Sequence, residues 1–137
     1  MAEQREFYVL SLKHTREGHR LVTWWRPDDK GYTWDLRQAG RYTEARITRP
    51  GERGLFYYNS GCGTVAVLCA DVDALAERVT LTVDEGPREF LGVRNHVYRL
   101  RRLFRAAPLP FDRPQHADPR WAKIHAHVAQ RREVVHG

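Results

Sequence analysis

The chain has 137 residues, of which 42% are hydrophobic and 29% are charged, and these proportions are typical of one globular domain in solution. No run approaches the roughly 18 apolar residues that a membrane span requires, and the N-terminus lacks the basic start and apolar run of a signal peptide. Composition therefore excludes a membrane-spanning protein, and we expect one that works in the cytoplasm without a membrane partner.

The N-terminal part of the chain predicts strands joined by turns. Residues 7–12 and 21–25 alternate with the period of two that strands show, and the glycine within residues 15–19 suits a hairpin turn. We therefore expect these two strands to pair antiparallel. Residues 27–31 combine a proline, two aspartates and a glycine, which predicts a surface loop, and a short third strand should follow at about residues 32–36.

The tryptophans of this region allow two interpretations. Trp24, Trp25 and Trp34 are three of the four tryptophans in the chain. In one interpretation they supply large apolar area to a small core. In the other they form a stacking platform for a base or a nicotinamide ring, with His14 and Arg26 near its rim. Because neighbouring strand residues point to opposite faces, at least one of Trp24 and Trp25 is either exposed or covered by a helix.

Two short helices are predicted in the middle of the chain. Thr43 is placed to cap the first, whose first turn carries Glu44, a favourable position for a carboxylate. Asp71 is placed to cap the second, which we expect to run to about Glu77. Pro50 and Gly51 end the first of these helices.

Strand patterns alternate with these helices. Residues 64–69 are β-branched, short and flanked by glycine, as in a buried strand, and residues 80–84 alternate as another strand. Residues 54–61 fit a strand and a helical turn equally well. Cys62 and Cys69, the only cysteines, do not have the spacing of a zinc site, so we expect free thiols, a buried Cys69, and neither a metal nor a cofactor.

Six short motifs in this region carry a resemblance. They are KHT (13–15), TWWRP (23–27), GYTW (31–34), AGRYTEA (39–45), FYYN (56–59) and TVAV (64–67). Over about the first 80 residues the chain resembles a family of short, uncharacterised proteins encoded in phages and prophages. The resemblance implies a phage accessory protein in the host cytoplasm, for which interference with a host defence system, in the manner of an anti-CRISPR protein, is one role. It assigns no catalytic residue and no cofactor.

Positive charge is concentrated in the C-terminal part. Residues 1–85 contain 12 Lys and Arg against 13 Asp and Glu, whereas residues 86–137 contain 11 against 4. Residues 92–105 predict an amphipathic helix within this basic part. Its apolar stripe comprises Val93, Val97, Leu100 and Phe104, and its opposite side comprises Arg94, Tyr98, Arg101, Arg102 and Arg105.

The arginine side of this predicted helix is either an ordinary solvated surface or a binding surface. No acidic residue lies between Arg94 and Arg105 to balance the charge. Guanidinium groups present paired donors that suit phosphate and carboxylate. Nucleic acid, a nucleoprotein complex or an acidic protein surface would fit such a partner site.

The chain ends with a connector and a further helix. Residues 107–119 hold four of the seven prolines and predict an extended connector between a domain of residues 1–106 and a helix with tail at residues 120–137. Asp118 and Pro119 suit the cap and first position of this helix. Its apolar residues are Trp121, Ile124 and Val128. The helix could pack on its own domain or on a second copy, which would make a homodimer.

An enzyme is the alternative function. His14, His96 and Glu44 are acid–base candidates, with Tyr32 or Tyr42 as ring partners, and a cleft between His14 and Glu44 would suit a small nucleotide- or NAD-dependent transferase or hydrolase. The simpler interpretation is that His14 and Tyr32 complete hydrogen bonds at the end of a hairpin. No phosphate-binding glycine loop, serine elbow or paired carboxylate motif is present in the sequence.

Together these patterns predict an α+β fold with a small mixed or antiparallel sheet packed by short helices. We expect the sheet to support a helix over residues 93–105 and to direct its arginines outward. The predicted function is that of a non-enzymatic binding protein.

Overall fold

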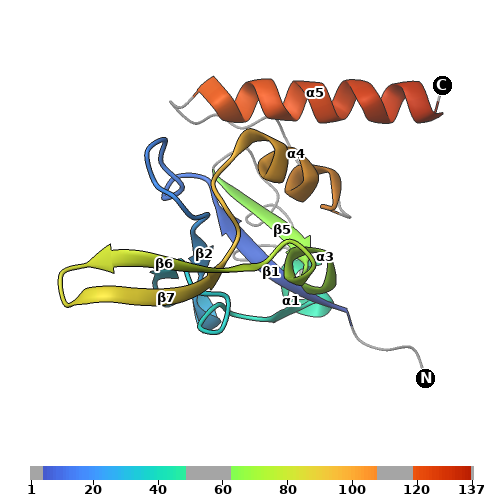
Figure 1. The fold of residues 1–137 in the computed structure, drawn as a ribbon. Helices are drawn as coiled ribbons and strands as arrows, with labels where there is room; N and C mark the ends of the chain where they lie inside the picture. The colour runs from blue at the N-terminus through green and yellow to red at the C-terminus, as the bar shows by residue number, and fades with distance from the viewer. Residues whose placement is uncertain (1–4, 49–62, 108–118, 137) are drawn as a thin grey trace.

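The structure is a computed structural model that describes residues 5–48, 63–107 and 119–136. The strands are β1 (Glu6–Ser11), β2 (Trp24–Trp25), β3 (Tyr32–Thr33), β4 (Tyr42–Thr43), β5 (Thr64–Leu68), β6 (Glu77–Val83) and β7 (Gly86–Gly92). The helices are α1 (Glu44–Thr48), α3 (Cys69–Asp73), α4 (Val97–Arg105) and α5 (Pro119–His136), with a short 3-10 turn η1 (Pro27–Asp29). Antiparallel sheets and separate helices make an α+β fold, as the sequence predicted (Figure 1).

β1 is the central strand of the main sheet, and both of its edges are paired. β5 runs antiparallel to β1 along one edge, from Phe7 to Ser11. β4 pairs with the start of the other edge, at Phe7, and β2 pairs with its end, where Trp24 lies opposite Leu10. β3 continues the sheet beyond β2. The predicted N-terminal hairpin and the buried strand at residues 64–69 are therefore confirmed, although β5 ends at Leu68.

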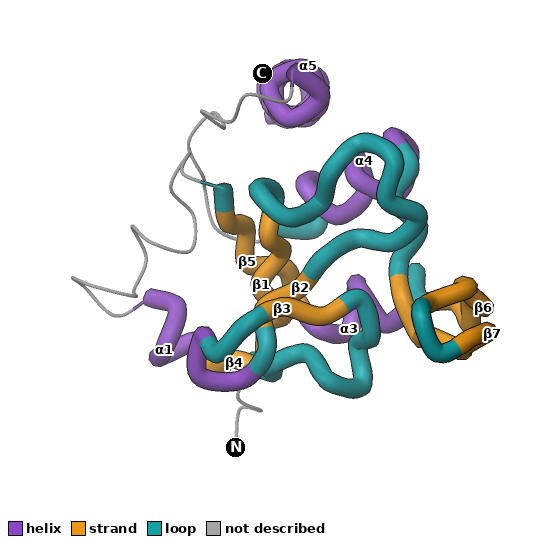
Figure 2. The backbone as a smooth tube through the Cα atoms, turned by 90° about the vertical axis from the view of Figure 1, so that its left-hand side faces the viewer, coloured by secondary structure: helices purple, strands orange, loops and turns teal. Residues whose placement is uncertain are grey.

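The side chains of β1 alternate between two cores on opposite faces of the sheet. Tyr8 and Leu10 lie in the larger core, which also contains Trp24 and side chains from α4 and α5. Phe7 faces the other way, into a smaller core with Trp25 and a residue of α1. Figure 2 shows the sheet between α1 on one side and α4 with α5 on the other. Two layers of helix therefore bury both faces of a strand that is almost wholly apolar.

The predicted elements around the sheet hold with shifted ends. Thr43 caps α1, since its Oγ1 accepts a hydrogen bond from the Arg46 N–H at 3.2 Å. α3 begins directly after β5, at Cys69, so the prediction that Asp71 caps this helix is wrong. The same helix ends at Asp73 rather than continuing to Glu77, because Glu77 already pairs with Gly92 in the β6–β7 hairpin.

The β6–β7 hairpin forms a second, two-stranded sheet. The predicted strand at residues 80–84 corresponds to β6, which starts three residues earlier. β7 was not predicted, because its sequence begins with glycine and proline and has no clear alternation; long-range pairing with β6 makes it a strand. Figure 1 shows the hairpin projecting from the body, where Val79 and Phe90 pack with Leu21 in a third small core.

The predicted helix over residues 92–105 is correct only from Val97 onward. Gly92 is the last residue of β7, and a Cβ there would lie 2.9 Å from the backbone oxygen of Trp34. The segment that follows is extended, and Val93 accepts a hydrogen bond from the Val22 N–H at 2.8 Å. His96 caps α4, its Nδ1 accepting from the Tyr98 N–H at 3.3 Å. Val93 is buried as predicted, but in an extended segment.

α5 packs on α4 of the same chain, which was one of the two arrangements predicted for it. Trp121 is fully buried and stacks on Phe104, with ring centroids 6.3 Å apart. Ile124 and Val128 are also buried, so the predicted apolar side of this helix is confirmed. Figure 1 shows α5 lying across α4 on the outside of the fold. No helix in the described parts of the chain is long and apolar enough to cross a lipid bilayer.

Several predictions concern residues outside the described ranges. They are the element at residues 54–61, the thiol of Cys62, the proline-rich connector and the capping role of Asp118. α5 does begin at Pro119, the first helical position that the sequence predicted.

Replacing Trp121 by alanine should lower the free energy of unfolding by about 3–5 kcal/mol, because it leaves a cavity between α4 and α5. Urea denaturation followed by circular dichroism measures the change. Lys123→Ala on the exposed side of the same helix is the matched control and should change stability little. Equal effects of the two substitutions would show that α5 does not dock through Trp121.

The buried carboxylate of Asp35 gives a prediction about acid stability. Its two oxygens accept hydrogen bonds from the Arg37 guanidinium at 2.7 and 2.9 Å, and this contact holds the pKa of Asp35 below its usual value. A lowered pKa stabilises the fold above the ordinary carboxyl pKa of about 4, and this contribution is lost as pH falls through the folded-state pKa. Asp35→Asn should therefore reduce stability at pH 7 and weaken its loss in acid, as measured by thermal unfolding across pH. Asp71→Asn, at an exposed site, should leave both unchanged.

Candidate functional site

The exposed side of α4 presents an aromatic ring among arginines. Tyr98 is 61% exposed, and Arg102 and Arg105 are exposed beside it. Arg101 lies at the edge of this side, with its guanidinium carbon 5.8 Å from the centre of the Tyr98 ring. Tyr98, Arg101, Arg102 and Arg105 are together called the α4 face. The underside of the helix is apolar, since Leu100, Leu103 and Phe104 are all buried.

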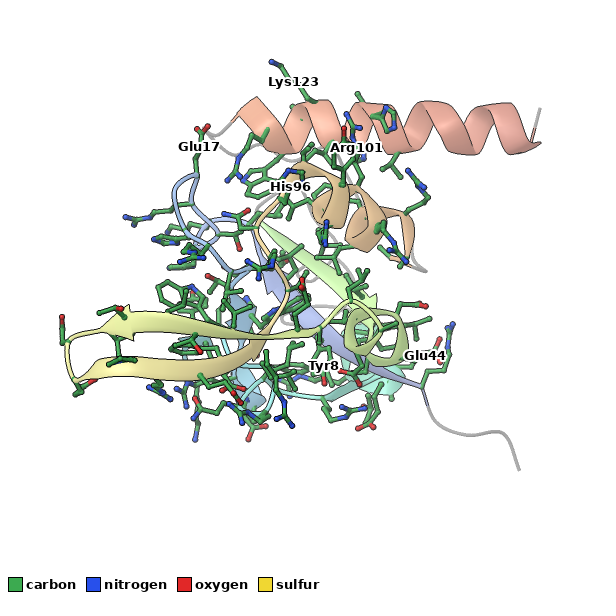
Figure 3. All side chains as sticks on the ribbon, in the orientation of Figure 1. Tyr8, Glu17, Glu44, His96, Arg101 and Lys123 are labelled. Atoms are coloured by element: carbon green, nitrogen blue, oxygen red, sulfur yellow. The ribbon has the colours of Figure 1, made fainter. Side chains whose placement is uncertain are left out.

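The four residues of the α4 face differ in their surroundings. The Arg102 guanidinium makes no hydrogen bond or ion pair with any residue of the described chain. Arg101 is half-buried, and its Nε has no hydrogen-bond partner within the described ranges. Figure 3 shows Arg101 on the side of α4 that faces α5. Arg102 therefore presents the more available charge, while Arg101 is restrained by its neighbours.

Arg94, which the sequence placed on the same helical face, lies elsewhere. It precedes α4, and its Nε lies 3.3 Å from a carboxylate oxygen of Glu77 at the start of β6. Arg99, on the flank of α4, lies 3.9 Å from the same carboxylate. The prediction that Arg94 belongs to the helix is wrong, because Arg94 lies in an extended segment that forms a β-bridge with Leu21. Its contact with Glu77 depends on the β6–β7 pairing, which local periodicity does not reveal.

The three tryptophans that the sequence offered as a stacking platform lie in different places. Trp24 is fully buried and Trp25 is 9% exposed, and they occupy the two cores on opposite faces of the sheet. Trp34 alone is partly exposed, and it packs edge-on against Phe90 of β7, with ring centroids 6.1 Å apart. A platform made of all three indoles is therefore excluded by their positions.

A hollow of about 330 Å³ lies beside Trp34. Its lining residues are His14, His19, Thr23, Tyr32, Thr33 and Trp34, and we call it the aromatic pocket. The His14 ring stacks on Tyr32 at 3.7 Å between centroids, and the His19 ring meets Trp34 edge-on at 5.4 Å. Two ring pairs therefore contribute to its wall.

A buried hydroxyl holds the two pairs in place. Thr23 Oγ1 accepts a hydrogen bond from the Trp34 indole at 3.0 Å and donates one to the His14 carbonyl at 2.8 Å. His14 Nδ1 also lies 2.9 Å from Ser11 Oγ at the end of β1. Nothing in the sequence indicated that Trp34 would join Thr23 and His14 in this way.

Two of the predicted catalytic residues lie away from this pocket. Glu44 pairs with Arg5, and this guanidinium holds the pKa of Glu44 below its usual value, which disfavours a role as a general acid. Tyr42 donates its hydroxyl hydrogen bond to the Arg26 carbonyl at 2.5 Å. β4 joins β1 at its start, roughly 17 Å along the strand from Ser11. The predicted cleft between His14 and Glu44 is therefore wrong.

A separate hollow of about 410 Å³ is lined by Tyr8, Arg41 and Asp73 among others. The Tyr8 hydroxyl donates to Asp73 Oδ1 at 2.9 Å and accepts from Arg41 Nη1 at 2.8 Å. Burial, reinforced by Asp73, raises the pKa of Tyr8, and burial also raises the pKa of the Cys69 thiol to about 12. Both groups therefore stay protonated at neutral pH, and neither is an activated nucleophile.

The α4 face and the aromatic pocket are joined by Asn95. Its side-chain amide donates to the carbonyls of Arg16 and His19, at 2.8 and 2.9 Å, and accepts from Arg120 of α5 at 3.2 Å. The hairpin loop beside the pocket is thus hydrogen-bonded to Asn95, which directly precedes the residue that caps α4. His96, an acid–base candidate from the sequence, serves as that cap at the surface.

In comparisons with known proteins, no family model, no curated protein and no solved structure matches this chain. The resemblance to phage-encoded proteins therefore stays a prediction. Among the described residues, no group of three or more His, Cys, Asp or Glu side chains is arranged to hold a metal ion.

Thr23→Val should destabilise the protein by about 1–3 kcal/mol, because it leaves the Trp34 indole N–H and the His14 carbonyl without their shared partner. Urea denaturation measures the difference. The control is Thr80→Val on the exposed side of β6, which should stay within about 0.5 kcal/mol of the unmodified chain. Equal stability of both variants would show that the Thr23 hydroxyl does not fix the two ring pairs.

Proposed function

We propose that this is a non-enzymatic binding protein that uses the α4 face to engage a negatively charged partner, either nucleic acid in a nucleoprotein complex or an acidic protein surface. The observation that carries the proposal is Arg102, an exposed guanidinium with no hydrogen bond or ion pair inside the described chain. It lies beside an exposed tyrosine on a helix that contains no acidic residue.

The chemistry of the α4 face favours phosphate as the group recognised. A guanidinium offers parallel donors to two phosphate or carboxylate oxygens, and a neighbouring aromatic ring adds a surface on which a base can stack. Tyr98 is the most exposed of the large hydrophobic side chains in the described chain, at 61%. A large ring left in water is often part of an interface, so the exposure of Tyr98 supports a binding role for the α4 face.

α4 holds its arginines at a defined spacing because the helix is anchored from below. Leu100, Leu103 and Phe104 are each fully buried beneath it. Arg102 and Arg105 are three positions apart on the helix and so lie on neighbouring turns of one side. A rigid support of this kind lowers the entropy that the two side chains and their helix lose on binding.

The narrower proposal concerns the biological setting. The resemblance of the N-terminal motifs to phage-encoded proteins supports a role as an inhibitor of a host defence complex, and a guide-bound nucleoprotein would offer the α4 face the phosphates that it suits. The homodimer considered from the sequence is less well supported, since Trp121, Ile124 and Val128 of α5 are already buried against the same chain.

The double substitution Arg102→Glu/Arg105→Glu should weaken binding to short DNA or RNA probes and flatten its dependence on salt. Each lost phosphate contact lowers the slope of log K against log salt by about 0.7–0.9, so the slope should fall by roughly 1.5 units. Fluorescence anisotropy across a salt series measures both quantities.

The matched control is Arg78→Glu/Arg88→Glu, which reverses two exposed arginines on the β6–β7 hairpin. It makes the same change in net charge, so it separates a local contact from overall attraction. If both double variants weaken binding equally, the α4 face is not the site. Retention of a host partner after nuclease treatment of a lysate would instead point to an acidic protein surface.

A further inference from the structure

The aromatic pocket is a second candidate binding site, separate from the α4 face. Its six lining residues come from the hairpin after β1 and from β3 with its flanking turn, and none belongs to α4. Its volume of about 330 Å³ is at the small end of ligand pockets in proteins. A mononucleotide or a single base is therefore a better match in size than a larger cofactor.

The walls of the pocket favour a flat ligand. Tyr32 is 37% exposed although it is an aromatic side chain on a strand, and its ring is held by the stack with His14. Trp34 is fixed by its indole hydrogen bond to Thr23, so the two ring pairs are ordered before any ligand enters. Aromatic side chains fixed in this way bind bases by stacking, with little loss of side-chain entropy.

His19, one of the lining residues, has a ring nitrogen with unused hydrogen-bonding capacity. The Nδ1 atom of His19 is buried and has no hydrogen-bond partner within the described part of the chain. An unpaired buried nitrogen has an energetic cost. Because this nitrogen is shielded from solvent, the polar edge of a base would pair with it only after the imidazole ring turns toward the pocket.

The segment that supplies three of the lining residues has an excess of basic side chains, which favours a negatively charged ligand. Residues 13–26 contain four basic side chains, those of Lys13, Arg16, Arg20 and Arg26, and one acidic side chain, that of Glu17. All five are exposed. Lys13 lines an adjoining hollow of about 210 Å³ on which His14 and Tyr32 also border. A phosphate attached to a base in the aromatic pocket would therefore meet positive charge at the adjoining hollow.

We propose that the aromatic pocket binds the base of a phosphate-bearing nucleotide, which stacks beside Tyr32 and Trp34. The ligand is either a free nucleotide or an unpaired residue of a nucleic-acid strand, since both present the same base and phosphate. The proposal goes beyond the role of the α4 face and does not depend on it, because a mononucleotide needs no contact with α4.

Isothermal titration calorimetry with AMP, GMP, CMP and UMP tests the proposal, with ribose 5-phosphate as the probe that lacks a base. At least one nucleotide should bind saturably at up to low-millimolar concentration and more tightly than ribose 5-phosphate. A single-stranded pentanucleotide and its abasic counterpart form a second arm. Because the α4 face also suits strand phosphates, only a base-dependent gain counts here. Binding of the pentanucleotide that is tighter than that of both its abasic counterpart and the best mononucleotide assigns the base to a nucleic-acid strand, and no such gain assigns it to a free nucleotide.

Tyr32→Leu removes the flat ring but keeps an apolar side chain, and it should weaken nucleotide binding by about 5- to 100-fold, the range expected for one stacking contact. Val97→Ala is the matched control, since Val97 is also 37% exposed and lies on α4 outside both sites. Near-ultraviolet circular dichroism checks that each variant is folded.

A measurement on the unmodified chain requires no variant. Titration with the nucleotide that binds most tightly should shift the indole NMR signal of Trp34, whereas the signal of Trp121, buried between α4 and α5, should stay in place. The proposal is overturned if no nucleotide binds saturably, if none binds more tightly than ribose 5-phosphate, if a folded Tyr32→Leu variant binds the tightest of them normally, or if that nucleotide does not move the Trp34 signal.

Discussion

Both edges and both faces of β1 are occupied by other parts of the chain, and the rest of the structure depends on this constraint. Both edges of this strand are hydrogen-bonded, to β5 on one side and to β4 and β2 on the other. Its alternate side chains fill two separate cores, with Tyr8 and Leu10 facing one and Phe7 and Val9 facing the other. A strand used on all four sides leaves little surface for a ligand, and Tyr8 and Ser11 alone of its residues border a hollow described above. The residues proposed to bind a partner therefore lie outside β1, on α4, in the hairpin loop after β1 and around β3.

The segment between β7 and α4 links the two candidate sites. It runs extended beside residues 20–22, to which Val93 and Asn95 are hydrogen-bonded through the backbone. The Asn95 side chain then joins the hairpin loop to Arg120 of α5. Because this loop carries His19, the aromatic pocket and the start of α4 are held by the same polar contacts. Two sites with different chemistry can thus be kept in a constant relation to one another.

Local patterns predicted the elements whose burial follows from their own alternation. Examples are the hairpin of β1 and β2, the buried strand β5 and the apolar side of α5. In each of them the spacing of apolar residues indicates which side is buried. The predicted start of the basic helix, near residue 92, was wrong for a specific reason. Val93 has the helical spacing from Val97 and is buried, but its place in the core comes from an extended segment beside Val22. Spacing alone does not distinguish these two cases.

The order of amino acids alone established the α+β class, the antiparallel hairpin, and the concentration of basic residues in the C-terminal part. Long-range pairing decided which of these residues are available. It brought Glu77 to Arg94, buried Trp24 and Trp25 on opposite faces, and separated Glu44 from the ring pairs that line the aromatic pocket. The physical reason is that a local pattern shows which side of an element is apolar, whereas charge neutralisation and pocket formation depend on residues that are distant in sequence.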